Sequence, residues 1–228
     1  MYDHVEKERL LLAVDCIVFG FDGEDLKVLL IKRGFEPEKG KWSLVGDFLS
    51  KNEILESAAT RVLNKYTGLD DVFMEQVATF SDINRDPEER IVSTAYYALI
   101  NIKEHSQKLK GQYSAQWFSV AAAPSLIFDH DEMVEAALKR LKLKAKTEPI
   151  GFELLPEKFT MRQLQRLYES IWNVSLDKRN FINKVRSLNV LQKLDEKDKT
   201  SSRKGAFLYR FDADRYREGE SSRSLLDF

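Results

Sequence analysis

The segment 46–69, GDFLSKNEILESAATRVLNKYTGL, constrains the fold more than any other part of the chain. Its apolar residues recur at helical spacing between residues 54 and 66, which predicts one amphipathic helix. Ser50 followed by Glu53 matches a capping box, in which each side chain bonds the backbone amide of the other residue. Gly68 stands where a left-handed residue closes a helix. We therefore expect a loop, a capped helix and a second loop.

Segments rich in β-branched and aromatic residues surround this helix and predict strands. The strands are expected at residues 10–22, 26–33, 41–45, 75–82, 90–101 and 115–120, with the first two forming a hairpin. A second helix is expected from residue 129 to residue 146, because Met133, Ala137 and Leu141 share one helical face. The pattern predicts an α/β (α+β) domain, an α/β/α sandwich built on a mixed sheet.

The pattern changes after residues 146–159, where three Pro and Gly positions and no clear period indicate a linker. Two amphipathic helices are expected at 160–172 and 177–188, with Thr160 and Gln163 as a capping box and Asp177 as an N-cap. Strands follow at 190–194 and 206–211, joined by a polar loop. Helix, helix and hairpin in this order predict a winged helix. We expect two domains, 1–148 and 149–228.

The helical segment resembles the Nudix box, a Gly-x5-Glu-x7-Arg-Glu-U-x-Glu-Glu-x-Gly-U motif in which U is aliphatic. Glu53, Arg61, Leu63, Gly68 and Leu69 occupy matching positions. Three carboxylates of the motif are replaced by Val62, Lys65 and Tyr66, and Asp47 replaces the leading glycine beside Gly46. The resemblance implies a fold that keeps its loop–helix–loop geometry without the carboxylates that hold Mg²⁺. We expect no metal, no cofactor and no catalytic residue.

A cleft between the box helix and the sheet remains available to a small molecule. Polar groups suited to a neutral polyol are expected along it, with Trp42 stacking on a sugar face. The candidate ligand-binding residues are Lys32, Trp42, Asp47, Asp82, Arg85, Arg90 and Tyr97. The alternatives are a purely structural domain, a surface ion pair for Arg85 and core packing for Tyr97. We interpret Asp15 as a structural carboxylate and His130 as part of a solvated helix start.

The C-terminal region is basic although the whole chain has a net charge of −1. Residues 158–204 hold twelve Lys and Arg against five Asp and Glu. Arg and Asn on the outer face of helix 177–188 could read base edges, the preceding helix could hold phosphates, and the loop 195–205 could act as a wing. The candidate DNA-binding residues are Arg162, Arg166, Lys178, Arg179, Asn180, Asn183, Lys184, Arg186, Lys199, Arg203 and Lys204. The alternative is a solvated basic face.

The segments LLPEKFTMRQLQRLYESIW and LDKRNF extend the resemblance to nearly the whole chain. The chain resembles Nudix-related transcriptional regulators, in which a Nudix-like sensor precedes a winged helix. Some members respond to ADP-ribose, and others are sugar-responsive; the arabinose-type repressors are the most similar. The resemblance implies a repressor of sugar utilisation genes with a pentose effector, L-arabinose first. It also implies a homodimer that binds a palindromic operator in double-stranded DNA.

The remaining sequence features favour a cytoplasmic protein. Cys16 is the single cysteine, the charged start MYDHVEKERL lacks a signal-peptide core, and Asp15 interrupts the longest apolar run. No membrane segment is expected. Two alternative functions stay open: a Nudix hydrolase of ADP-ribose-like compounds that uses Glu53, Glu56 and Asp47, and an adaptor whose basic module binds an acidic protein.

Overall fold

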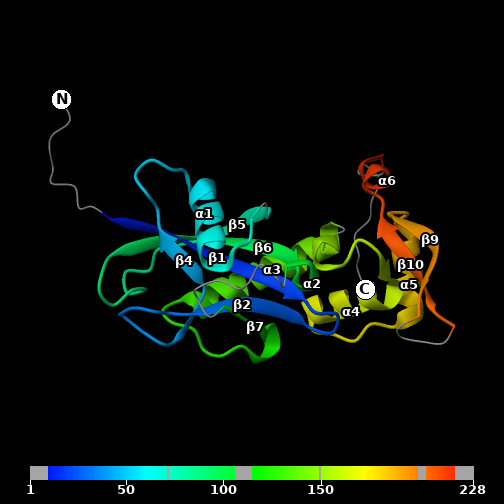
Figure 1. The fold of residues 1–228 in the computed structure, drawn as a ribbon, viewed down its shortest axis with the longest axis horizontal. Helices are drawn as coiled ribbons and strands as arrows, with labels where there is room; N and C mark the ends of the chain where they lie inside the picture. The colour runs from blue at the N-terminus through cyan, green and yellow to red at the C-terminus, as the bar shows by residue number, and fades with distance from the viewer. Residues whose placement is uncertain (1–9, 71, 106–114, 149, 200–203, 219–228) are drawn as a thin grey trace.

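The computed structural model describes residues 10–70, 72–105, 115–148, 150–199 and 204–218. Figure 1 shows a large unit built on a twisted sheet and a smaller C-terminal unit at one end of it. Among the described residues, no helix combines the length and the apolar character needed to cross a lipid bilayer.

The large unit contains a mixed sheet, as the sequence predicts. Its strands are β1 (Leu11–Phe21), β2 (Leu26–Lys32), β3 (Trp42–Ser43), β4 (Val45–Phe48), β5 (Met74–Phe80), β6 (Ile91–Asn101) and β7 (Gln116–Ser119). The order is β3-β2-β1-β6-β5, with β4 also pairing β1 and β7 also pairing β2. β1 runs parallel to β6 along its whole length, whereas the other pairs are antiparallel.

Two helices cover opposite faces of this sheet. Successive side chains of a strand point to opposite faces, and β1 therefore supplies Val14, Cys16 and Val18 to one core and Ile17, Phe19 and Phe21 to the other. α1 (Leu55–Thr67) packs its buried Ala58, Ala59, Val62 and Leu63 into the first core. α3 (His130–Thr147) packs Met133, Ala137 and Leu141 into the second. The predicted α/β/α sandwich is confirmed, with short α2 (Ile102–His105) between β6 and β7 and the 3₁₀ turn Val120–Ala122 between β7 and α3.

The beginning of α1 differs from the predicted capping box. The helix starts at Leu55, after Ile54 in an extended conformation and without a side-chain cap. The Glu53 carboxylate does accept a hydrogen bond from the Ser50 amide at 2.6 Å, but the Glu53 amide donates to the Ser50 carbonyl instead of the hydroxyl. The other end follows the prediction, since Gly68 closes the helix with a φ of 74°.

The C-terminal unit is a winged helix. It consists of β8 (Phe159–Thr160), α4 (Met161–Trp172), α5 (Lys178–Ser187), β9 (Leu191–Asp198), β10 (Ala206–Phe211) and α6 (Ala213–Glu218). Both predicted N-caps are present: Thr160 and Gln163 form the capping box of α4, and Asp177 caps α5. The linker prediction was partly wrong, because this region contains the 3₁₀ turn Phe152–Leu154 and the strand β8. The predicted loop 195–205 is also shorter, because β9 continues to Asp198.

The two units share one hydrophobic core. A single cluster of buried side chains contains Phe19 and Met133 from the large unit and Leu164 and Phe181 from the winged helix. The Trp172 Nε1–H of α4 donates to the Lys142 carbonyl of α3 at 3.2 Å. α3 ends at Thr147, one residue before the predicted boundary, and this boundary stays a prediction because the core continues across it.

Candidate functional site

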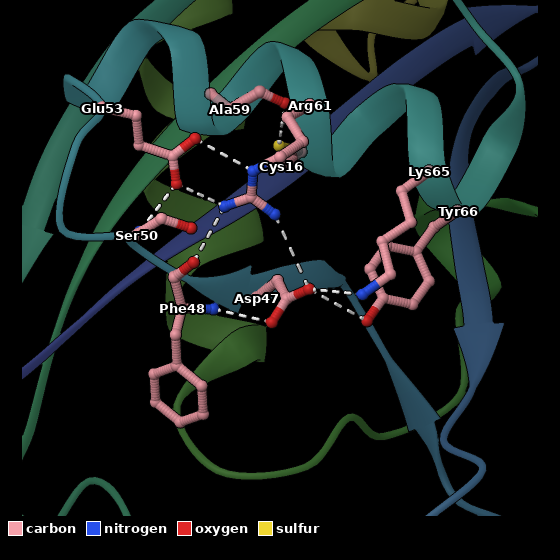
Figure 2. A network of polar contacts seen from close by, with 9 residues as sticks. All are labelled: Cys16, Asp47, Phe48, Ser50, Glu53, Ala59, Arg61, Lys65 and Tyr66. Atoms are coloured by element: carbon pink, nitrogen blue, oxygen red, sulfur yellow. Dashed lines mark hydrogen bonds and ion pairs between the residues drawn. The ribbon is translucent and has the colours of Figure 1, made fainter.

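The glutamate that remains of the box is held by an arginine of the same motif (Figure 2). Arg61 Nε donates to Glu53 Oε2 at 2.9 Å, and Arg61 Nη2 donates to Oε1 at 2.6 Å. These bonds from Arg61, together with the Ser50 amide, lower the pKa of Glu53 to about 2. Both carboxylate oxygens therefore already have charged donors.

A lysine neutralises the second acidic group of the box region. Lys65 Nζ donates to Asp47 Oδ2 at 2.7 Å, the Tyr66 hydroxyl lies 3.4 Å from the same oxygen, and Arg61 Nη1 lies 3.8 Å from it. Burial opposes ionisation, but the bonds from Lys65 and from the Phe48 amide lower the pKa of Asp47. Val62 is fully buried in the core behind the helix.

The divalent ion of Nudix enzymes does not fit these residues. A hard cation needs several free oxygen ligands, and both nearby carboxylates are occupied by cationic side chains. In the part of the chain that the structure describes, no group of three or more His, Cys, Asp and Glu side chains is placed to hold a metal ion. The carboxylates of Glu53 and Asp47 are thus paired with Arg61 and Lys65 instead of being free to bind a divalent ion.

A buried polar cluster lies below the cleft, and it corrects two sequence interpretations. His130 is 4% exposed rather than solvated, and its Nδ1 accepts a hydrogen bond from the Leu44 amide at 3.1 Å. Its Nε2 therefore carries the proton and lies 3.6 Å from Asp15 Oδ1. Arg85, considered as a surface ion pair, is 8% exposed and donates twice to Asp129, at 2.8 and 2.7 Å. Burial lowers the pKa of His130 more than Asp15 and Asp129 raise it.

Asp15 has the structural role that the sequence indicated. Its Oδ2 accepts a hydrogen bond from the Ser93 hydroxyl at 2.6 Å, and Arg85 Nη2 lies 3.9 Å away. Gly46 makes room for it, because a Cβ at this position would lie 2.0 Å from Asp15 Oδ1. The cluster thus joins β1, β4, β6 and the start of α3 beneath the cleft.

Two adjoining cavities form a cleft beside this cluster, and no residue of α1 lines them, so this cleft differs from the one expected between the box helix and the sheet. The smaller, about 90 Å³, is lined by residues that include Asp15, Arg33, Asp47, Arg85 and Phe128. The larger, about 450 Å³, contains Asp82, Arg85, Phe128 and Asp129. Both cavities contain Arg85 and Phe128, so they are neighbours. The structure thus brings together three predicted ligand-binding residues: Asp47, Asp82 and Arg85.

The other predicted ligand residues lie outside these cavities. The Trp42 ring packs edge-on against Phe118, with centroids 4.7 Å apart, and Lys32 Nζ lies 5.3 Å from the Trp42 ring centroid. Arg90 donates to the Ser81 and Asp82 carbonyls at 3.0 and 2.9 Å, which fixes the loop beside the cleft. Tyr97 is buried, as its core-packing alternative predicted, and its hydroxyl lies 3.4 Å from Glu75.

Sequence reasoning missed an aromatic-flanked arginine in the cleft. The Arg33 guanidinium lies 4.2 Å from the Phe35 ring centroid and 5.4 Å from that of Phe128. Its Nε is buried and has no hydrogen-bond partner among the described residues. The signal in the sequence was a cation directly followed by Gly and Phe at the end of an apolar strand.

The winged helix presents the predicted basic face. Lys178, Arg179, Asn180, Asn183 and Arg186 of α5 are exposed, Lys184 is half-buried, and Phe181 and Val185 point into the core. Arg162, Lys199 and Lys204 are also exposed, whereas Arg203 lies outside the described residues. Arg166 is placed differently from the prediction of a phosphate contact, because it forms an ion pair with Glu24 of the large unit. That pair joins the turn between β1 and β2 to α4.

Comparisons with known families match both units. The NUDIX domain matches residues 9–138, and the NrtR DNA-binding winged helix domain matches residues 151–211. The chain is 34% identical over 205 residues to the ADPR responsive transcriptional repressor NtrR of Acinetobacter baylyi, covering 88% of this chain and 82% of that protein. It is 30% identical over 131 residues to an ADP-ribose pyrophosphatase of Methanocaldococcus jannaschii, covering 58% of this chain and 77% of that protein.

Two solved structures of Shewanella oneidensis NrtR are also similar. NrtR complexed with a 27mer DNA has a TM-score of 0.80 at 28% identity, over 95% of this chain and 99% of that chain. Its NUDIX domain complexed with ADP ribose has a TM-score of 0.53 at 31% identity, over 61% and 94%. These relatives support a Nudix regulator but not the sugar-responsive subgroup that the sequence analysis favoured, because their descriptions name ADP-ribose.

Proposed function

Because this chain belongs to the Nudix family and joins its Nudix domain to a DNA-binding winged helix of the NrtR type, we propose that it is a transcriptional repressor controlled by ADP-ribose. In this proposal the Nudix cleft binds ADP-ribose without cleaving it, and binding weakens the affinity of the winged helix for DNA. A homodimer would present two α5 helices to a palindromic operator. The expected arabinose effector is replaced here by ADP-ribose, since the similar regulators respond to that compound.

One observation carries the proposal: the cleft is open while the box carboxylates beside it are ion-paired. Glu53 is held by Arg61 and Asp47 by Lys65, so the groups that would activate a metal-bound water are unavailable. A pocket without a metal site can bind a ligand and report its presence. It cannot supply the Lewis acid on which Nudix hydrolysis depends.

The polar groups of the cleft match the chemistry of a nucleoside diphosphate sugar. Arg33 offers a buried, unpartnered Nε to a pyrophosphate oxygen, and guanidinium groups pair well with phosphate. The flanking rings of Phe35 and Phe128 provide flat apolar surfaces for a base or a ribose. The Asp82 carboxylate, at the wall of the larger cavity, can accept hydrogen bonds from ribose hydroxyls.

Calorimetry on the full chain tests the effector. We expect heat on titration with ADP-ribose and none with L-arabinose. Arg33→Gln should weaken binding about tenfold or more, because a hydrogen bond to a charged group contributes about 1.5–3 kcal/mol. Lys39→Gln is the matched control, since this exposed lysine lies on the same turn and lines neither cavity. Binding of arabinose, or equal affinity in both variants, would reject the assignment.

Anisotropy on a labelled duplex tests the regulatory step. A duplex selected from random sequences should bind more tightly than a scrambled one, and ADP-ribose should weaken that binding. If ADP-ribose does not change the affinity for DNA, the proposed effector is wrong, and only the proposed DNA binding stands. Absence of any preferred duplex would favour the adaptor alternative.

The runner-up function is a metal-dependent hydrolase, as in the pyrophosphatase relative. It would require Glu53, Glu56 and Asp47 to act together. Glu56 is exposed, whereas Glu53 and Asp47 are engaged by cations, so this arrangement offers no shared metal position. We therefore place this activity second.

A further inference from the structure

The strands β9 and β10, which form the stem of the wing, carry two lysines that lie over one aromatic ring. Lys193 Nζ lies 3.7 Å from the Phe207 ring centroid, and Lys197 Nζ lies 4.5 Å from it. In the hairpin, Lys193 lies opposite Tyr209 and Lys197 lies opposite Phe207, with an irregularity between these pairs. The bulge in β9 thus brings two cations four residues apart onto the same ring.

Both lysine charges remain available to an anion, because Lys193 and Lys197 are exposed. Two ammonium groups near one ring repel each other, and Phe207 is 39% exposed, which leaves a large apolar ring in water. Among the described residues, neither lysine has a carboxylate within ion-pair distance. The nearby Glu196 is already engaged by Lys158, at 2.7 and 2.8 Å, and Asp195 is exposed. Cation–π contact fixes the two charges without neutralising them.

Lys193 of this pair lies next to α5, the helix proposed to read base edges. Lys193 and Tyr209 line a depression of about 220 Å³ together with Val185, Arg186 and Asn189 at the end of α5. Figure 1 shows β9 and β10 beside α5 in the C-terminal unit. Arg186, Lys193 and Lys197 therefore follow one another from the helix onto the stem of the wing.

Resting on the proposed function, we infer that Lys193 and Lys197, positioned by Phe207, bind two phosphates of the DNA strand that borders the groove entered by α5. Lysine ammonium groups bind phosphates as point charges, and duplex DNA presents such charges at regular spacing. Holding the ammonium groups on the ring before DNA arrives reduces the side-chain entropy lost on binding. The stem of the wing, and not only its tip, then contributes affinity that is independent of sequence.

Anisotropy on a random-sequence 30-bp duplex at several salt concentrations tests this inference with the full chain. Lys193→Gln with Lys197→Gln should reduce the slope of log affinity against log salt by about two units, since each lost phosphate contact removes about 0.9. The matched control is Lys39→Gln with Lys139→Gln, which removes the same charge from exposed positions of the large unit. This control should leave the slope unchanged.

Phe207→Leu separates the ring from the charges. It keeps both lysines and an apolar side chain, so we expect weaker duplex binding than in the wild type but stronger than in the double lysine variant. Unchanged thermal unfolding midpoints would show that each variant still folds. If the Phe207→Leu variant has the circular-dichroism spectrum and unfolding midpoint of the wild type and also binds the duplex with wild-type affinity, the positioning role of the ring is overturned.

Three further outcomes are distinguishable. If the wild type binds no duplex, the proposed function fails. If the wild type binds duplex and the double lysine variant keeps the full salt slope, the phosphate site is overturned while the repressor proposal stands. If the double lysine variant loses binding to a polyglutamate peptide but not to the duplex, the pair serves an acidic protein instead.

Discussion

Lys65 Nζ lies 2.7 Å from Asp47 Oδ2, so a cationic side chain stands at a box position where the Nudix motif has a carboxylate. Lys65 of α1 provides a positive charge and Asp47 of β4 a negative one, as a metal ion and a carboxylate ligand would. This pair and the Arg61–Glu53 pair join the loop of the motif to its helix.

The wild-type protein should not hydrolyse ADP-ribose, diadenosine polyphosphates or NADH above background with Mg²⁺ or Mn²⁺. The reason is that Val62, Lys65 and Tyr66 leave no set of free oxygen ligands for the ion. Product formation followed by chromatography is the measurement. Metal-dependent turnover that disappears in Glu53→Gln would contradict this prediction.

Glu53 should contribute stability that depends on pH. Its pKa is lowered from 4.5 to about 2 in the folded chain, mainly by Arg61. Between pH 4.5 and pH 2 the unfolded chain binds a proton on Glu53 that the folded chain does not bind. The stabilisation from ionised Glu53 is therefore complete above pH 4.5 and is lost as the pH falls through 2. Urea unfolding should show Glu53→Gln less stable than wild type at pH 6, with the difference shrinking towards pH 3. A difference independent of pH would reject this account.

His130 should make the protein less stable in mild acid. Burial lowers its pKa below the ordinary 6.5, so the unfolded chain takes up a proton that the folded chain does not. Stability should therefore fall as the pH drops below 6.5, by at most about 1.4 kcal/mol per pH unit for one proton. His130→Gln should flatten the dependence of the urea midpoint between pH 7 and pH 5. An unchanged slope would assign the effect to other groups.

Gly46→Ala should destabilise the Nudix domain. The new Cβ would meet Asp15 Oδ1 at 2.0 Å and displace the carboxylate from Ser93 and His130. Overpacking a tight site costs about 1–3 kcal/mol, which denaturant unfolding can resolve. Gly34→Ala is the control, because a Cβ there has no neighbour within 4 Å. Equal loss in both variants would point to backbone effects instead of the clash.

Arg179→Ala or Asn180→Ala should reduce specific DNA binding by about 1–3 kcal/mol and relax preference at one base pair in each half-site. Both residues are exposed at the start of α5, just after the cap Asp177. Lys204→Ala should weaken all duplexes alike and lower the salt slope by about one unit. Anisotropy on the selected and scrambled duplexes measures both effects. Specific binding that survives Arg179→Ala would mean that another element reads the bases.

Much of the fold was predictable because its signals are local. Helical spacing gave α1, α3, α4 and α5, and residue types gave Gly68, Thr160 and Asp177 their capping positions. The replacement of the box carboxylates is likewise a matter of residue identity. The start of α1 was less predictable, because the Ser50 carbonyl competes with its hydroxyl for the Glu53 amide.

The sequence by itself therefore determined the two architectures, their order, the loss of the metal ligands and the basic face of α5. Only the tertiary structure decided which distant side chains meet. His130 is buried beside Asp15, and Arg85 pairs with Asp129 in the interior. Arg166, predicted to contact a phosphate, forms an ion pair with Glu24. The physical reason is that these contacts join elements 44 to 142 residues apart, so they depend on how helices pack on the sheet. No periodicity within one element carries that information.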